Sequence, residues 1–160
     1  VYSEAAKYAA DLKESGKEKI VFTNGCFDIL HVGHARYLAE ARALGDALIV
    51  GLNSDSSVKR LDKGEERPIV PEGERAEMLE HLASVSKVFL FSEDTPLELI
   101  QAVCPDILVK GGDWAPETIV GNEFVTSHGG LVRSLPFHPG HSTTDIVATI
   151  IGAHGKSSHS

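Results

Sequence analysis

Five short runs of aliphatic and β-branched residues recur along the chain, and a segment rich in helix-forming residues follows most of them. Runs of this length between turn-forming residues are typical of buried strands. Strands that alternate with helices favour a parallel sheet with right-handed crossovers. The expected strands are residues 19–24, 46–53, 87–91, 106–110 and 130–135. The sequence therefore predicts a doubly wound, three-layer α/β sandwich with a five-stranded parallel sheet.

The length of 160 residues suits one domain with a substantial core. No internal repeat and no linker of biased composition divides the sequence. We expect a single domain over residues 1–154 and a flexible tail over residues 155–160, which read GKSSHS. The expected helices are residues 3–15, 35–44 and 72–83, a helix opened at 94–96, residues 116–127, and a helix from residue 142.

Charge and hydropathy exclude several classes of protein. The net charge of −8 argues against a general nucleic-acid-binding surface. No apolar run approaches the roughly 18 to 20 residues of a membrane span. The two cysteines, Cys26 and Cys104, form no C-x-x-C motif and no disulfide framework, which suits a reducing compartment. We therefore expect a cytoplasmic protein with neither a nucleic-acid nor a membrane partner.

Polar and glycine-rich segments follow several of the predicted strands. In a parallel sheet the carboxyl ends of the strands meet at one edge, and ligands bind there where the strand order reverses. The convergence of these segments predicts one binding site at that edge. They are residues 23–28 with 31–34, 53–57, 110–114 and 137–144.

His31 and His34 flank Gly33 where a strand gives way to a helix. Residues three apart share a face of a first helical turn, so both imidazoles can point at one ligand. Free N–H groups and the helix dipole favour a phosphate there, and a glycine lets it approach the backbone. The alternative is a helix start whose histidines only cap and pack. A lysine and arginine cluster in the loop of residues 59–67 could cover the site or be a solvated surface.

Two further classes of function stay open from the residues alone. Two H-x-x-H pairs, His31 with His34 and His138 with His141, could hold zinc together with Asp28 or Cys26 in a metal-dependent hydrolase. Against that, no H-E-x-x-H motif is present, and we assign no residue to a metal. A nucleotide-sensing module without chemistry is the other alternative, but it leaves the paired histidines unexplained.

The motifs resemble those of the nucleotidyltransferase superfamily with H-x-G-H and S-T-T signatures. The matching segments are GCFDILHVGH at 25–34, KGGDW at 110–114 and HSTT at 141–144. Within that superfamily the sequence is most similar, over residues 19–151, to the D-glycero-β-D-manno-heptose 1-phosphate adenylyltransferase (ADP-heptose synthase) family. The resemblance implies a Rossmann-like fold and transfer of AMP from ATP to the sugar 1-phosphate. The products would be pyrophosphate and ADP-heptose for the lipopolysaccharide core.

The same resemblance implies roles for individual residues. His31 and His34 would be catalytic, donating hydrogen bonds to phosphate oxygens of ATP. The nucleotide-binding residues would be Cys26, Phe27, Gly33, Lys110, Gly111, Asp113, Gly140, His141, Ser142, Thr143 and Thr144. The sugar phosphate would be bound by Asn53, Asp55, Lys63 and Arg75. We also expect Mg²⁺ as a cofactor, a homodimer, and a separately encoded sugar kinase upstream.

Glycerol-3-phosphate cytidylyltransferases share these motifs and are the nearest alternative. They carry an arginine a few residues before the S-T-T, where this chain has Phe137, His138 and Pro139. This departure favours the adenylyltransferase and leaves His138 or His141 as a polar substitute. Either enzyme would use in-line displacement at phosphorus without a general base, so alignment and charge neutralisation would supply the catalysis.

Overall fold

A computed structural model describes residues 2–61 and 63–157. Its centre is one all-parallel sheet with the strand order β3-β2-β1-β4-β5. The strands are β1 (Ile20–Gly25), β2 (Ala47–Asn53), β3 (Lys87–Phe91), β4 (Ile107–Gly111) and β5 (Leu131–Leu135). The predicted five-stranded α/β sandwich is confirmed, and each predicted strand lies within one residue of its observed bounds.

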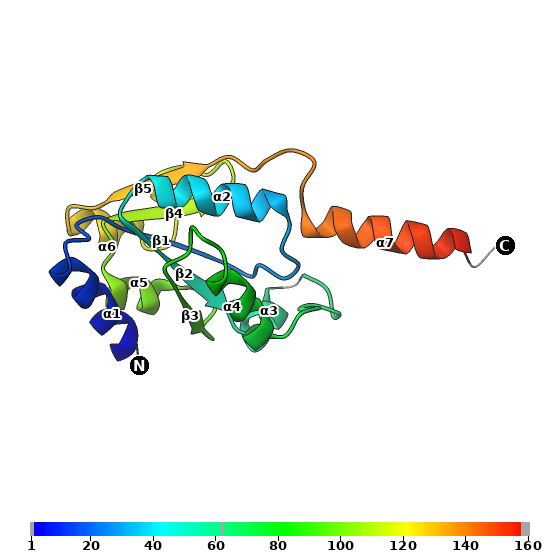
Figure 1. Cartoon of the computed structure of the whole chain (residues 1–160), viewed down its shortest axis with the longest axis horizontal. Helices are drawn as coiled ribbons and strands as arrows, with labels where there is room; N and C mark the ends of the chain where they lie inside the picture. Colours follow the sequence, from blue (N-terminus) through cyan, green and yellow to red (C-terminus); the bar gives the residue numbers. More distant parts are fainter. Residues whose placement is uncertain (1, 62, 158–160) are drawn as a thin grey trace.

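Helices cover both faces of this sheet (Figure 1). The helices are α1 (Ser3–Glu14), α2 (Val32–Ala43), α3 (Asp55–Arg60), α4 (Glu72–Glu80), α5 (Leu97–Val103), α6 (Asn122–Ser127) and α7 (Thr143–Ser157), with a 3-10 turn η1 (Pro116–Thr118). In the described residues no helix is long and apolar enough to cross a membrane.

Alternation along the strands creates two separate cores. In β1, Val21 packs with residues of α2 and α4, whereas Ile20 and Phe22 pack with residues of α1, α5 and α6. In β2, Leu48 and Val50 face the first of these cores and Ile49 faces the second. Because successive side chains of a strand point to opposite faces, one strand serves both layers. This is the physical basis of the three-layer arrangement.

The order of the strands reverses at β1. This strand pairs with β2 on one side and with β4 on the other, and both partners run parallel to it. The connections from β1 and β4 therefore leave on opposite faces, which opens a crevice beyond the carboxyl ends of these two strands. The segment after Gly25 and the segment after Gly111 border that crevice.

Three local predictions need correction. The expected long loop after β2 begins with helix α3, because the Ser54 side chain accepts a hydrogen bond from the Ser57 N–H at 3.2 Å and caps the helix. The single helix expected over residues 116–127 is split, since Ile119 is extended and Gly121 takes a φ of 92°. Pro96 is the N-cap of α5 rather than its first helical residue.

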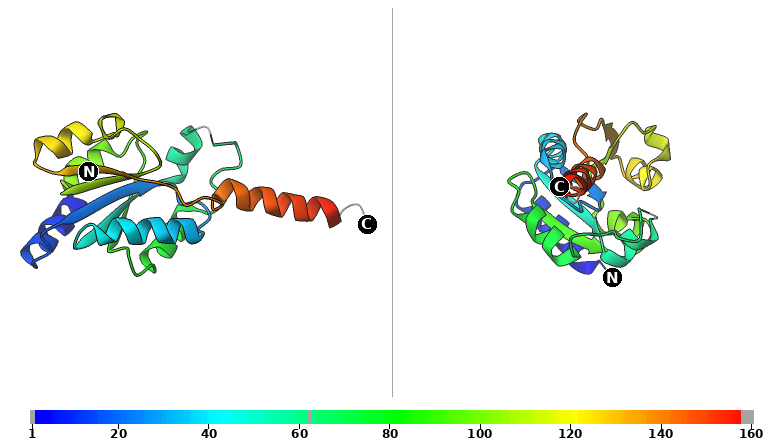
Figure 2. Two further views of the ribbon diagram at one scale, coloured as in Figure 1. Left: turned by 90° about the horizontal axis from the view of Figure 1, so that it is seen from above. Right: turned by 90° about the vertical axis from the view of Figure 1, so that its right-hand side faces the viewer.

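Helix α7 leaves the body of the domain and projects beyond the carboxyl edge of the sheet, as Figures 1 and 2 both show. It continues to Ser157. The flexible tail expected from residue 155 is therefore helical in its first three residues, and residues 158–160 lie outside the described part of the chain. Its exposed apolar side chains include Ile150 and Ile151.

We predict that Gly51→Ala destabilises the domain. A methyl group on Gly51 would lie 2.7 Å from Cζ of Phe22 and 3.1 Å from Cδ2 of Leu99, both fully buried, so the core would have to shift. Overpacking of this kind costs about 1–3 kcal/mol of unfolding free energy, measurable by urea denaturation. The matched control is Gly73→Ala in α4, where a methyl group meets nothing within 4 Å. A Gly51→Ala protein as stable as the control would contradict the prediction.

Candidate active site

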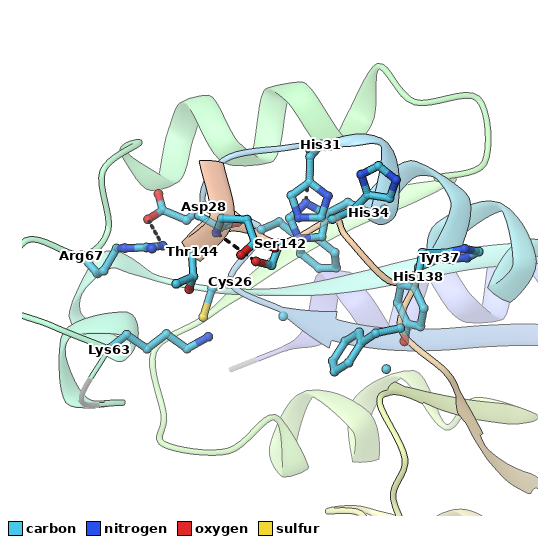
Figure 3. Close-up of a pocket in the computed structure, with 18 of the residues that line it drawn as sticks. Cys26, Asp28, His31, His34, Tyr37, Lys63, Arg67, His138, Ser142 and Thr144 are labelled. Atoms are coloured by element: carbon cyan, nitrogen blue, oxygen red, sulfur yellow. Dashed lines mark hydrogen bonds and ion pairs between the residues drawn. The ribbon is translucent and has the colours of Figure 1, made fainter. Parts of the chain in front are cut away.

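A cavity of about 710 Å³ lies at the carboxyl ends of β1 and β4. The start of α2, the loop after α3 and the start of α7 enclose it (Figure 3). Both predicted catalytic histidines line it, together with Lys63. The predicted nucleotide-binding residues in its lining are Cys26, Phe27, Gly33, Lys110, Gly111, Gly140, His141, Ser142, Thr143 and Thr144. Segments more than 100 residues apart in sequence are thus brought to one site.

The two histidines of the H-x-G-H motif form a stacked pair. Their ring centroids are 3.8 Å apart at an interplanar angle of 23°. His31 is the N-cap of α2, and Nδ1 of His34 accepts a long hydrogen bond of 3.4 Å from the His31 backbone N–H. Because Nδ1 of His34 is an acceptor, its neutral ring carries the proton on Nε2. Nδ1 of His31 is buried without a hydrogen-bond partner among the described residues. An unpaired polar atom in a cavity points to a ligand.

Burial keeps this histidine pair uncharged. Desolvation first, then the neighbouring His31 and Lys63, lowers the pKa of His34 from its ordinary 6.5 to about 4. Desolvation and then His141 lower the pKa of His31. At neutral pH the histidines therefore present neutral N–H donors, while the positive charge of the site comes from lysine and arginine side chains.

Gly33 is required by close packing as well as by ligand access. A methyl group at this position would lie 2.9 Å from Cβ of His141 and 2.9 Å from Cε1 and Nδ1 of His31. The glycine thus lets the H-x-G-H turn and the segment before α7 approach each other. The sequence analysis assigned this space to a phosphate, and the structure adds two imidazole side chains that fill part of it.

The start of α7 is fixed by its own hydroxyl residues. Ser142 Oγ accepts a hydrogen bond from the Asp145 N–H at 3.0 Å, which is the capping interaction that the spacing indicated. Thr143 Oγ1 donates to the carbonyl of Ile29 at 3.3 Å and ties α7 to the loop before α2. The first turn of α7 therefore faces the cavity with its backbone N–H groups, an arrangement that favours anions.

Asp28 anchors the loop that covers the cavity. Its buried carboxylate accepts hydrogen bonds from the N–H groups of Ile69 and Val70, both at 2.9 Å, and pairs with Arg67 at 3.2 Å. Figure 3 shows Lys63 and Arg67 approaching the cavity from the side opposite the histidines. Asp28 was considered only as a possible zinc ligand, and its role as the anchor of this loop was not predicted. Its position three residues before the H-x-G-H motif was the only available signal.

Three of the four predicted sugar-phosphate residues lie outside the large cavity. Arg75 is 1% exposed, and its guanidinium donates to the carbonyls of Cys26, Asn53 and Val70. It also pairs with Asp55 at 2.7 Å. Four of its five N–H groups are thereby used, so Arg75 organises the site instead of facing its opening. Asn53 is buried and donates to Ser57 Oγ at 3.0 Å.

Aromatic side chains surround the glycines that end β4. A methyl group on Gly111 would lie 3.1 Å from Cε1 of Phe137, which is 72% exposed. Trp114 donates to the Gly111 carbonyl at 3.1 Å, and Lys110 Nζ lies 4.4 Å from its ring centroid. The exposed rings of Phe137 and Trp114 thus offer aromatic surface beside the end of β4. Asp113, predicted to bind nucleotide, is exposed and lines neither described cavity.

Other residues of the cavity have structural roles. Desolvation raises the pKa of the Cys26 thiol although Lys63 and Arg75 oppose the shift, so Cys26 remains a protonated thiol at neutral pH. The Tyr37 hydroxyl lies 2.6 Å from Thr23 Oγ1, and burial raises its pKa to about 12. His138 Nε2 lies 2.7 Å from Glu40 Oε1, which holds the segment before α7 against α2. Sequence reasoning missed Tyr37 and Phe137 because nothing local distinguishes them from core residues.

A second cavity of about 300 Å³ adjoins the first. The end of β1, Lys63 and Lys110 line both cavities. Asn53 lines only the second, together with Leu61, Asp94 and Thr95. The two cavities therefore share the end of β1, Cys26 and the two lysines, and are otherwise lined by different residues.

The described residues include no group of three or more His, Cys, Asp or Glu placed to hold a metal ion. Both H-x-x-H pairs line the large cavity, but His138 Nε2 lies 2.7 Å from Glu40 Oε1 and the four histidines form no such group. The zinc-hydrolase alternative therefore lacks a donor set in this part of the chain.

The sequence profile of the cytidylyltransferase-like family matches residues 22–149. The chain belongs to the cytidylyltransferase-like family. The matched segment contains most of β1, the H-x-G-H turn, β4 and the first turns of α7, and these elements line the large cavity. The resemblance that the motifs indicated is thus confirmed.

Curated relatives include two bifunctional proteins named HldE. The protein from Geobacter metallireducens is 54% identical over 144 residues, covering 90% of this chain and 29% of the relative. The protein from Helicobacter pylori is 57% identical over 137 residues, covering 86% of this chain and 28% of the relative. The chain thus spans less than a third of the length of these relatives. Their bifunctional naming differs from the stand-alone arrangement with a separate kinase that we expected.

A solved structure of similar fold is the lipopolysaccharide core biosynthesis protein from Thermoplasma volcanium. It superimposes with a TM-score of 0.61 at 30% sequence identity, covering 75% of this chain and 96% of that protein. The parallel sheet and its flanking helices are therefore common to both proteins.

We predict that His34 makes the fold less stable in acid. Its pKa in the folded state, about 4, lies below the ordinary 6.5, so the unfolded chain binds the proton more readily. The unfolding free energy should therefore fall as the pH drops from about 6.5 to about 4. The variant His34→Gln has no titrating group at this position. Its unfolding free energy, measured by urea denaturation, should therefore fall less steeply over that pH window. Parallel curves for the two proteins would contradict the prediction.

Proposed function

We propose that this chain transfers AMP from ATP to D-glycero-β-D-manno-heptose 1-phosphate, giving ADP-heptose and pyrophosphate. The observation that carries the proposal is the cavity in which the H-x-G-H histidines, the S-T-T helix start and Lys63 converge. The high identity to HldE proteins and the fold shared with a lipopolysaccharide core biosynthesis protein support the choice of substrates.

The reaction is an exchange of one P–O bond for another. An oxygen of the sugar phosphate, already anionic at neutral pH, forms a bond to the α-phosphorus of ATP. The bond from that phosphorus to the bridging oxygen breaks, and pyrophosphate leaves with the electron pair. No proton has to be removed, so the site must align the reactants and stabilise negative charge.

The residues of the cavity divide this task. The neutral N–H groups of His31 and His34 donate to oxygens of the α-phosphate. The first turn of α7, capped by Ser142, holds the departing β- and γ-phosphates with backbone N–H groups. Lys63 and Arg67 supply positive charge from the opposite side (Figure 3). The phosphate anion in turn raises the pKa of the nearby histidines, which strengthens their donation once ATP is bound.

The base lies on the surface formed by Gly111 and Phe137. A purine ring stacks more extensively than a pyrimidine ring, and the exposed Phe137 face offers that area. The segment before the S-T-T lacks the arginine of glycerol-3-phosphate cytidylyltransferases, and His138 at this place is engaged with Glu40. These two features favour ATP over CTP.

We also propose that Mg²⁺ binds together with ATP. Mg²⁺ keeps several water ligands and binds phosphate oxygens, so it needs few protein ligands. Among the described residues the carboxylates that line the large cavity are Asp28 and Asp145. Because Asp28 is bonded to Ile69, Val70 and Arg67, Asp145 is the carboxylate available to hold the ion. No step of the mechanism depends on it.

We further propose a cellular location, a source of the sugar phosphate and an oligomeric state for the enzyme. We place it in the cytoplasm, where ATP is abundant, with a sugar kinase supplying the heptose 1-phosphate. We also propose a homodimer, for which the exposed Ile150 and Ile151 of the projecting α7 offer an apolar surface.

The test of the reaction is release of pyrophosphate by the purified protein with Mg²⁺, heptose 1-phosphate and each nucleoside triphosphate in turn. We expect release with ATP and at least about tenfold less with CTP, since the base surface favours a purine. Release with CTP and glycerol 3-phosphate instead would establish the cytidylyltransferase alternative. Nucleotide binding without release in any combination would indicate a sensor and overturn the proposal.

We predict that His31→Ala and His34→Ala each lower kcat by about a hundredfold or more, because each removes a donor to charge that grows in the transition state. The fold should persist, as judged by circular dichroism. The matched control is His128→Ala on the exposed surface of α6, which should turn over like the wild type. Near-normal kcat in both active-site variants would refute their role.

A further inference from the structure

The second cavity, of about 300 Å³, has a cationic end and an acidic end. Lys63 and Lys110 line its boundary with the large cavity, whereas Asp94 and Thr95 line only the second cavity. Asp94 is its only carboxylate among the described lining residues. A phosphate near Asp94 would be repelled, and a phosphate between the lysines would be attracted. This arrangement favours an orientation in which the phosphate of a ligand lies toward the two lysines.

Asp94 is held at the rim by an ion pair. Its Oδ1 lies 2.7 Å from Nε of Arg60, and Arg60 Nη2 also donates to the carbonyl of Ser92. These contacts tie the end of α3 to the segment after β3. Oδ2 of Asp94 has no partner among the described residues, so it is available to accept hydrogen bonds. A carboxylate can accept from two hydroxyl groups at once, as on neighbouring carbons of a sugar.

An apolar wall completes the cavity. Leu61, Ile119 and Val120 line it, and Leu61 and Val120 are each 38% exposed. Carbon-bound hydrogens of a sugar ring pack against aliphatic side chains of this kind, while hydroxyls at the ring edge reach polar groups. The lining thus combines the three features of a sugar phosphate: an anion, an apolar ring face and hydroxyl groups.

We propose that the second cavity binds the acceptor with its phosphate between Lys63 and Lys110 and its hydroxyls on Asp94 and Thr95, so that Asp94 selects a polyhydroxylated acceptor. The inference rests on the nucleotidyl transfer proposed above. It places the attacking oxygen at the boundary of the two cavities, next to the α-phosphate held by the histidines. It also gives Asp94, to which the sequence analysis assigned no role, that of a specificity-determining residue.

The experiment compares Asp94→Asn with Arg60→Gln. Both variants break the same ion pair, but only the first removes the carboxylate. The dissociation constant of heptose 1-phosphate is measured by calorimetry in the presence of a non-hydrolysable ATP analogue. We expect Asp94→Asn to raise this Kd about tenfold or more, as for the loss of hydrogen bonds to a charged acceptor. Arg60→Gln should change it less than about threefold, because Oδ2 remains.

Inorganic phosphate is the probe for the cationic end. It should bind Asp94→Asn at least as tightly as the wild type, because it contacts the lysines and avoids Asp94. The KM for ATP should not change in either variant. Equal losses of heptose 1-phosphate affinity in the two variants would mean that Asp94 acts only through its ion pair with Arg60. That result would overturn the inference. An unchanged Kd in Asp94→Asn would also overturn it.

Binding and turnover separate this inference from the proposed reaction. If the wild type binds heptose 1-phosphate through Asp94 yet releases no pyrophosphate, the reaction is refuted and the acceptor site stands. If pyrophosphate is released and Asp94→Asn binds the sugar phosphate normally, the acceptor site is refuted and the reaction stands.

Discussion

A buried guanidinium holds together the carboxyl edge of the sheet. Arg75 donates to carbonyls at the ends of β1 and β2 and in the loop before α4, and it pairs with Asp55 at the start of α3. These carbonyls belong to irregular backbone that leaves the sheet and would otherwise be unsatisfied in a buried region. A charge in such a place is tolerable only when its hydrogen bonds are made. Arg75 therefore joins the ends of β1 and β2 to the start of the loop's return at Val70, while Asp28 anchors the loop itself.

The site combines uncharged donors with cations at its border. The two histidines are stacked, and desolvation lowers the pKa of both. At neutral pH they therefore offer uncharged hydrogen-bond donors instead of positive charge. The lysines and arginine supply attraction from a loop that Asp28 anchors. This division suits a displacement in which charge moves from one phosphate to another. In the proposed reaction the histidines donate hydrogen bonds at the reacting phosphorus, and the cations attract the anionic substrates and products.

Much of the fold followed from local sequence because buried parallel strands are short, aliphatic and flanked by turn residues. The H-x-G-H and H-S-T-T segments were predicted to converge, since both follow strands at the same edge. The family resemblance led us to predict that Arg75 contacts the sugar phosphate, and a charged residue in a polar helix normally lies on the surface. Its burial depends on carbonyls from three distant segments, which no local pattern records. The sequence placed Phe137 in a site segment but gave it no role, and it gave Asp94 no role, because which cavity each residue lines depends on segments distant in sequence.

Helix α7 begins inside the nucleotide cavity and ends far outside the domain (Figures 1 and 2). Its first turn is set by Ser142 and by the Thr143 bond to Ile29. At about 1.5 Å per residue, its 15 residues extend about 22 Å. A small tilt of the helix axis at the first turn would therefore displace the far end of α7 by a larger distance.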